Sequence, residues 1–221
     1  MSEFDSEPVS GLPERLPEGE SLLWQGQPAW RSLAIRAFHI RKIALYFAFL
    51  VAAQAVVSFS SGTGLAGAMK PALWLVTFAI AACAIAALLA WLYARTTVYT
   101  LTNRRIVMRY GAALPMALNL PFREIAAAAA AIHADGTADI PLAINSNGRI
   151  SYVHLWPHAR PWRLNRPEPM LRSVPDGARI AALLASALAA YHGMAAQTAI
   201  EVNRAPLAKP EPTRPLAPAA A

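Results

Sequence analysis

Two long apolar runs limit what this chain can fold into. The first, Ile43–Phe59, is interrupted only by Gln54 and Ser58, and the second, Pro71–Ala94, contains no charged residue. A helix rises about 1.5 Å per residue, so about 20 residues cross the hydrocarbon core of a bilayer. We therefore predict two membrane-spanning helices, at about residues 43–61 and 71–93. A buried core helix of a soluble domain is the less favoured alternative, because aromatic residues mark the ends of the runs: Tyr46, Trp74, Trp91 and Tyr93.

The composition agrees with a membrane protein. Of the 221 residues, 56% are hydrophobic and 15% are charged, whereas an average soluble domain has about 25% charged residues. The formal net charge of +7 suits either nucleic acid or a membrane surface. Because this charge accompanies a mean hydropathy of +0.33, we favour the membrane and expect no nucleic-acid partner. Cys83 is the only cysteine, so we expect no disulfide framework.

Basic residues predict the orientation of the two helices. The segment between the runs, SSGTGLAGAMK, carries only Lys70 as a charge. The two outer flanks carry eight basic residues: Arg31, Arg36, Arg41, Lys42, Arg95, Arg104, Arg105 and Arg109. Basic residues accumulate on the cytoplasmic side of membrane proteins. We therefore expect a helical hairpin in the inner membrane (cytoplasmic or intracytoplasmic), with both termini in the cytoplasm and no signal peptide.

The residues after the hairpin predict a small β-rich domain. TTVYTLTNRRIVMRYG favours two strands around a turn at Asn103, and MALNLPFREI favours another strand. The run Ala126–Ala131 is ambiguous, since alanine favours helix. The segments ADIPLAI and ISYVHLW are predicted as strands joined by a turn at Asn145–Gly148, and Asp135-Gly136 marks a further turn. Apolar residues recur at helical spacing over 177–192, which predicts a helix that caps the sheet.

These patterns divide the chain into four parts. An acidic cytoplasmic segment covers residues 1–30, the membrane hairpin 31–95, and the cytoplasmic domain with its C-terminal helix 96–192. The proline- and alanine-rich residues 193–221 are predicted to be disordered. The predicted fold class is an α+β membrane protein, with a transmembrane hairpin and a small antiparallel sheet or barrel capped by a helix.

Several motifs resemble a known family. GESLLWQGQPAW, with Glu20, Trp24 and Trp30, is similar to the opening motif of bacterial PH-like membrane proteins, and Tyr99–Ile106 is similar to their first hairpin. SEPVSGLPERLPEGE and ARPWRLNRPEPMLRSVPDGARIAALLA resemble the PuhB family of photosynthetic complex assembly proteins of purple bacteria. This resemblance covers roughly Glu7–Tyr191. It implies a PH-like domain on a two-helix anchor.

The resemblance also implies a function. Such proteins are non-enzymatic factors that assist assembly of the reaction centre and the light-harvesting 1 complex, so the implied partners are subunits of those complexes and no cofactor is expected. Two alternatives stay open: a PH-like membrane module that binds anionic lipid or another membrane protein, and a carrier of bacteriochlorophyll. A homo-oligomer also stays open, since the alanine-rich second run offers a smooth face to the first helix, a client or a second copy.

Arginine and tryptophan after the last predicted strand suggest a docking surface for lipid headgroups or an acidic client, because both residue types are enriched at binding hot spots. The plain alternative is a solvated basic loop, and for the hairpin arginines a turn that faces the headgroups. The candidate residues are Trp156, Arg160, Trp162, Arg163, Arg166, Arg172, Arg104 and Arg105.

Other candidate chemistry is sparse. His154 and His158 stand four residues apart, but Pro157 lies between them, so we expect no metal site. His39 precedes the first apolar run, where a pigment ligand is conceivable and an interfacial histidine is favoured. We find no phosphate-binding glycine loop, serine elbow or clustered carboxylate pair, and we expect no enzyme.

Overall fold

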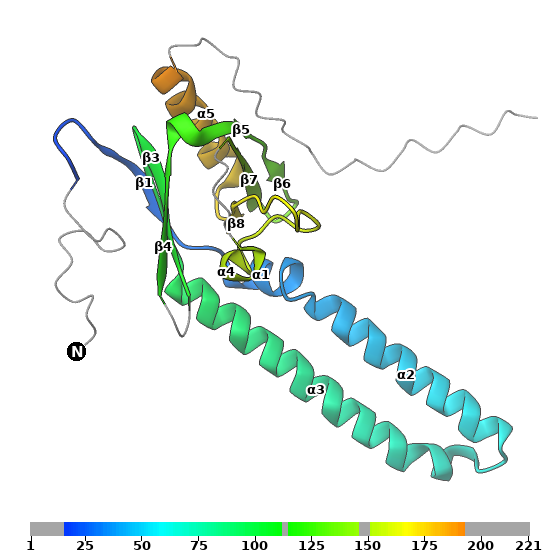
Figure 1. Cartoon of the computed structure of the whole chain (residues 1–221). Coiled ribbons are helices and arrows are strands. Elements are labelled where there is room, and N and C mark those ends of the chain that lie inside the picture. The colour runs from blue at the N-terminus through cyan, green and yellow to red at the C-terminus, as the bar shows by residue number, and fades with distance from the viewer. Residues whose placement is uncertain (1–15, 112–114, 146–150, 193–221) are drawn as a thin grey trace, which may run out of the picture.

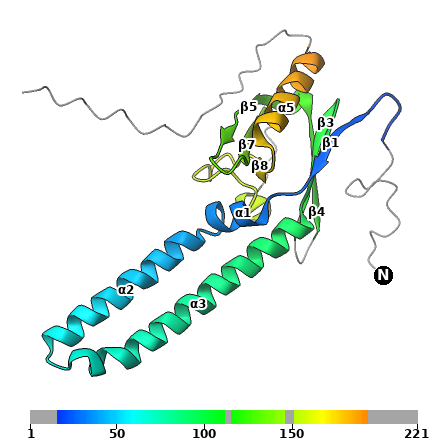
Figure 2. The same cartoon turned by 180° about the vertical axis from the view of Figure 1, so that it is seen from behind.

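The two apolar runs form the two longest helices of the protein. The computed structural model describes residues 16–111, 115–145 and 151–192. Helices α2 (Ile40–Ser60) and α3 (Gly64–Thr96) lie side by side as a hairpin, with the rest of the described chain at one end (Figures 1 and 2). Both are long and apolar enough to cross a membrane, with mean hydropathies of 2.0 and 2.5 in their most apolar stretches.

The link between these helices is shorter than the sequence suggested. Helix α3 begins at Gly64 and continues through Pro71, whereas the prediction began this helix at residue 71. The hydroxyl of Thr63 donates to the carbonyl of Ser58 at 2.9 Å, which closes the turn within a few residues. The residues before Pro71 include Leu65, Ala66 and Ala68, which are good helix formers. One missing N–H inside an apolar helix is tolerated.

A short helix joins the hairpin to the domain. Helix α1 (Trp30–Arg36) buries Ser32, Leu33 and Ala34 and packs against α3. The α3 face that is buried toward its domain end consists of Ala86, Ala90 and Ala94. Small side chains let helix backbones approach closely. Other parts of the same chain therefore cover this part of the alanine-rich face.

Four antiparallel strands form the first sheet, in the order β1-β2-β3-β4. They are β1 (Leu22–Gly26), β2 (Val98–Thr102), β3 (Arg105–Tyr110) and β4 (Met116–Pro121). The predicted hairpin is confirmed, since β2 and β3 pair around Asn103. Strand β1 was not predicted: it comes from the acidic N-terminal segment and pairs with β2, more than 70 residues later in the chain.

The second sheet centres on β7 (Ala138–Ile144), which pairs with β5 (Ile125–Ala128), β6 (Ala131–Ile132) and β8 (Met170–Val174). A 3-10 turn, η1 (Phe122–Glu124), leads from β4 into β5. The alanine run is extended, because its backbone finds hydrogen-bond partners in β7 and its small side chains fit into the core. Within the described residues the two sheets stay separate and do not close into a barrel.

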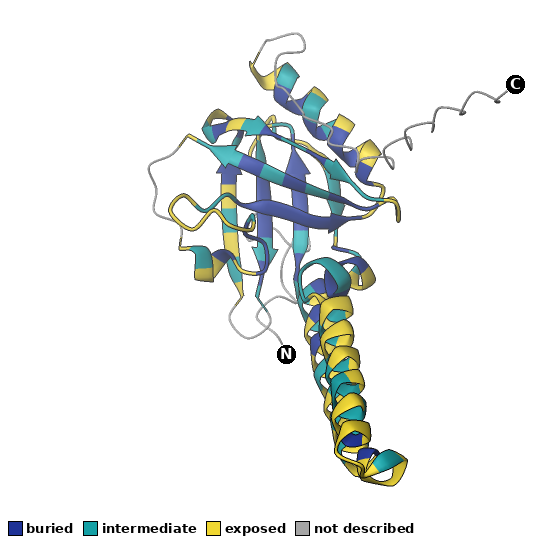
Figure 3. Ribbon diagram, turned by 90° about the vertical axis from the view of Figure 1, so that its right-hand side faces the viewer, coloured by how far each residue is buried: buried dark blue, intermediate teal, exposed yellow. Residues whose placement is uncertain are grey.

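Helix α5 (Gly177–His192) confirms the predicted C-terminal helix and packs on the second sheet. Its buried residues Ile180, Leu184 and Leu188 join Tyr99, Ile106 and Phe122 in the main core. Buried residues concentrate in the sheets and under α5, whereas the hairpin surface is mostly exposed (Figure 3). The exposed side chains of the hairpin are largely apolar, as expected of helices that face lipid rather than water.

One strand prediction is wrong. The segment ISYVHLW contains a short helix, α4 (Tyr152–Leu155), instead of a strand. The strand that pairs with the free edge of β7 is β8, which comes from the arginine- and proline-rich stretch that was predicted as a docking surface or a solvated loop. Strand β7 has two edges: β5 and β6 pair with one and β8 pairs with the other, so no edge is left for residues 152–155. The predicted turn beyond Asn145 and the tail 193–221 lie outside the described residues.

Candidate docking surface

An aromatic cluster fixes the domain to the apolar hairpin. Trp156, which follows α4, packs edge-on against Phe38 at the α1–α2 junction (ring centroids 5.4 Å apart) and against Tyr93 near the end of α3 (5.6 Å). Phe38 and Tyr93 also touch each other, at 5.9 Å. Trp156 keeps 41% of its surface exposed. Trp156 therefore makes internal contacts and also keeps part of its surface exposed, and its predicted docking role stays a prediction.

A buried polar cluster forms around His158, two residues after this tryptophan. His158 is fully buried; its Nδ1 lies 2.7 Å from the hydroxyl of Tyr99 and its Nε2 lies 3.1 Å from the hydroxyl of Thr97. The backbone N–H of Arg172 donates to the Tyr99 oxygen at 3.0 Å. Assigning the phenol proton to the bond with Nδ1 and the imidazole proton to Nε2, which donates it to Thr97, gives each of these groups a partner. The Tyr99 hydroxyl also lies 3.5 Å from the carbonyl of Arg172.

Burial controls the protonation of this cluster. Burial and, to a smaller extent, the nearby Arg172 guanidinium together lower the pKa of His158 to about 3, so the imidazole is neutral at pH 7. Burial likewise raises the pKa of the Tyr99 hydroxyl. With both ring nitrogens bonded inside the domain, His158 is not available to a metal, and His154 is exposed four residues away.

Arg172 is not part of a docking surface. It lies in β8 and is only 8% exposed, and its Nη1 donates to the carbonyl of Pro157 at 3.0 Å. The sequence prediction grouped it with Arg160, Arg163 and Arg166 because it follows them in the same arginine- and proline-rich stretch. Pairing of β8 with β7 turns the residue inward instead.

The segment between α4 and β8 carries the remaining candidates. An isolated pairing of Ala159 with Pro169 closes a loop, which we call the arginine loop (residues 160–168). At its base Arg160 donates to Glu168 at 2.7 Å, and Arg163 approaches the other carboxylate oxygen at 3.7 Å. Trp162 is 94% exposed and Leu164 is 64% exposed. Arg166 is exposed as well. Four predicted residues therefore lie together in this loop: Arg160, Trp162, Arg163 and Arg166.

Arg104 and Arg105 lie elsewhere. Strand β2 begins directly after α3, so the β2–β3 turn is about 13 Å further along the strand from the end of the hairpin. The turn therefore lies away from the ends of the apolar helices. The plain alternative for these two arginines was a turn that faces the headgroups. Arg105 forms two hydrogen bonds with Glu20, at 2.7 and 2.8 Å, and so ties the N-terminal segment to the sheet.

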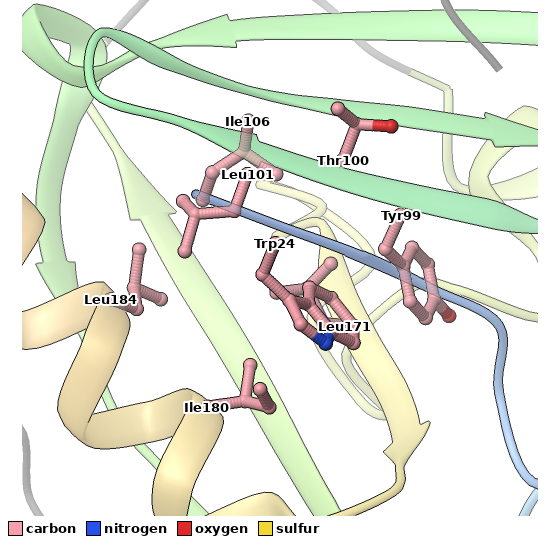
Figure 4. A pocket seen from close by; sticks show the side chains of 8 residues that line it. All are labelled: Trp24, Tyr99, Thr100, Leu101, Ile106, Leu171, Ile180 and Leu184. Atoms are coloured by element: carbon pink, nitrogen blue, oxygen red, sulfur yellow. The ribbon is translucent and has the colours of Figure 1, made fainter. Parts of the chain in front are cut away.

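A small cavity in the interior beside β1 is too small for a sizeable ligand. It lies between Trp24 and the α5 residues Ile180 and Leu184 (Figure 4), and its free volume is about 10 Å³. That is about the space of one water molecule. We therefore consider the surface rather than the core as the functional region. His39, the remaining histidine candidate, is exposed at the start of α2.

Comparison with known proteins gives the family. The model of the family described as "Bacterial PH domain" matches residues 46–188. The chain belongs to the bacterial PH domain family. The matched part of this bacterial PH domain protein begins inside α2 and ends inside α5. Helix α1 and strand β1 precede it, although β1 completes the first sheet.

A relative narrows the comparison. The chain is 35% identical over 186 residues to a protein of Rhodobacter capsulatus described as "Uncharacterized 23.7 kDa protein in puhA 5'region", covering 84% of this chain and 87% of the relative. This match agrees with the resemblance to the PuhB family. No solved structure matches the chain.

Proposed function

We propose that this bacterial PH domain protein is a non-enzymatic, membrane-bound assembly factor for the photosynthetic reaction centre and its light-harvesting 1 complex. Two findings support the proposal. A relative that shares 35% of its residues is described by its position in the puhA 5' region, and two apolar helices suit attachment to the membrane in which such complexes form.

The observation that carries the proposal is the attachment of the domain to the hairpin. Helix α1, the Trp156 cluster and the direct continuation of α3 into β2 hold the domain at one end of the two helices. A domain held in this way stays next to the membrane surface. Its effective concentration toward other membrane proteins is then much higher than that of a soluble domain.

Charge supports an orientation with both termini in the cytoplasm. Basic residues gather where the hairpin meets the domain: Arg31, Arg36, Arg41, Lys42 and Arg95. Lys70 is the basic residue near the opposite end. By the inside-positive rule the domain faces the cytoplasm. The inner membrane is the expected location.

Two aspartates of the domain, Asp135 and Asp139, make structural contacts. Asp135 accepts hydrogen bonds from Thr137 and pairs with Arg36 at 3.1 Å. Asp139 lies 3.3 Å from His133 and accepts the backbone N–H of Ser173. Their roles in holding turns and strands support a binding function rather than catalysis.

The test is isolation of the tagged full chain from phototrophically grown membranes in a mild detergent. We expect reaction-centre or light-harvesting polypeptides in substoichiometric, growth-stage-dependent amounts, and a matching absorption spectrum. A tagged, unrelated two-helix membrane protein is the control. Pigment without these polypeptides would favour the carrier function, and an eluate of lipid and the protein alone would refute the assembly role.

A further inference from the structure

The exposed tip of the arginine loop has no partner inside the described chain. Trp162 leaves 94% of its surface uncovered and Leu164 leaves 64%. Trp162 also has a backbone φ of +65°, in the left-handed region that a bulky residue rarely adopts. A strained, uncovered tryptophan points to a contact outside the domain.

The loop also carries surplus positive charge. Glu168 is its single carboxylate, shared by Arg160 and Arg163. Arg166 has neither an ion pair nor a hydrogen bond within the described residues. The loop therefore combines apolar side chains with a net charge of +2 from three arginines and one glutamate. An anionic surface with an apolar interior satisfies both features.

The geometry of the hairpin brings a membrane surface close to this loop. Helix α2 has 21 residues and ends at the short turn where α3, which has 33 residues, begins. The difference of 12 residues, about 18 Å, lies at the domain end. This extension of α3 still exposes Leu88, Leu89 and Trp91. The apolar band therefore continues past the start of α2.

A tryptophan–arginine pair marks the end of that band. The guanidinium of Arg95 lies 4.9 Å from the ring centre of Trp91, and a second pair, Trp30 and Arg31 on α1, has a separation of 5.5 Å. Tryptophan is favoured where hydrocarbon meets headgroups. The arginine loop, drawn in yellow in Figure 1, lies on the side of the domain from which α2 departs, and Figure 2 agrees.

We propose that the arginine loop is a second membrane contact, in which Trp162 and Leu164 enter the interfacial layer and Arg163 and Arg166 bind the phosphates of anionic lipids. This contact is independent of the assembly role. It gives the domain a second point of contact with the membrane, in addition to its attachment to the hairpin.

The test uses the full chain in lipid nanodiscs without any client protein. In a Cys83→Ser background, a solvent-sensitive dye is attached to Leu164→Cys, with Ala182→Cys on the exposed face of α5 as the matched control. The discs contain phosphatidylcholine alone or with phosphatidylglycerol, plus a lipid with a headgroup nitroxide that quenches nearby dyes.

We expect several-fold stronger quenching at 164 than at 182 in the phosphatidylglycerol discs, with a shift of the dye emission to shorter wavelength. Arg163→Ala with Arg166→Ala should reduce the effect of phosphatidylglycerol, as should 1 M salt, which shortens the Debye length from about 10 Å to about 3 Å. Both arginines are exposed, so the double variant should fold.

Three results would overturn the proposal. The first is equal quenching at positions 164 and 182. The second is quenching at position 164 that changes neither with phosphatidylglycerol nor in the double arginine variant. The third is a dye at position 164 that is shielded from solvent in native membranes but not in the nanodiscs, which would assign the loop to a protein partner. If the isolation from membranes recovers no photosynthetic polypeptides, the assembly role is refuted but the quenching results still stand. The two proposals can therefore fail separately.

Discussion

The hydroxyl of Tyr99 lies 2.7 Å from Nδ1 of His158, in the interior between the two sheets. Tyr99 belongs to β2, which continues directly from the apolar helix α3, and the same hydroxyl accepts the backbone N–H of Arg172 in β8. One phenol oxygen therefore joins the strand that leaves the hairpin to the second sheet. The domain is anchored through hydrogen bonds as well as through aromatic packing.

Removal of this hydroxyl should destabilise the domain. Tyr99→Phe leaves both Nδ1 of His158 and the N–H of Arg172 buried without a partner, and an unsatisfied buried polar group costs about 1–3 kcal/mol. We expect a lower thermal unfolding temperature in detergent. Tyr191→Phe, at a partly exposed position on α5, is the control and should change the temperature little. An unchanged temperature in Tyr99→Phe would mean that the interaction contributes no net stability.

Stability should depend on pH through His158. Its pKa is about 3 in the folded protein and about 6.5 in an unfolded chain. The unfolded state therefore binds a proton that the folded state does not bind as the pH falls below about 6.5. The free energy of unfolding should decrease by about 1.4 kcal/mol per pH unit below that value.

Denaturant titrations between pH 6.5 and 4.5 test this dependence. The contribution of Asp135, whose hydrogen bonds from Thr137 and Arg36 outweigh burial and hold its pKa at about 2, is lost only at lower pH. His158→Gln should flatten the slope in this window, whereas His154→Gln at an exposed position should retain it. An equal slope in both variants would assign the pH dependence to other groups.

The Trp156 cluster should set the orientation of the domain. Trp156→Ala removes ring contacts with Phe38 and Tyr93, each worth about 0.5–1.5 kcal/mol beyond simple burial. With spin labels on Cys83 in α3 and on Ala182→Cys in α5, we expect a broader distance distribution. Trp162→Ala, in detergent and without lipid, is the matched control and should leave the distribution narrow. A narrow distribution in Trp156→Ala would show that α1 and the α3–β2 junction suffice.

The pair formed by Glu20 and Arg105 should hold the N-terminal strand on the sheet. The Glu20 side chain is only 3% exposed and both its oxygens accept from the guanidinium. Hydrogen bonds to charged groups contribute about 1.5–3 kcal/mol. Glu20→Gln should therefore speed amide hydrogen exchange in β1 about tenfold or more. Exchange in β3 and β4 should change less, and Glu18→Gln at an exposed position should have little effect.

Local patterns in the sequence were sufficient to predict the helical hairpin and several helices and strands of the domain. The apolar runs locate α2 and α3 because length and hydrophobicity are properties of each segment alone. The Asn103 turn and the helical spacing over 177–192 locate the β2–β3 hairpin and α5 for the same reason. The exposed arginines at 163 and 166 were also identified, since a proline-rich segment cannot bury them in a regular helix.

Tertiary pairing decided the remaining features. Two segments become strands because β2 and β7 offer free edges: Leu22–Gly26 and Met170–Val174. Distant residues create these edges, so the local sequence of the two segments does not predict them. The same pairing places Arg172 inside, and His158 is buried because Thr97 and Tyr99 satisfy both its ring nitrogens. Composition thus determined which segments form the two long apolar helices. Long-range hydrogen bonding determined which of its polar residues remain on the surface, because a polar group can be buried only where the fold supplies its partner.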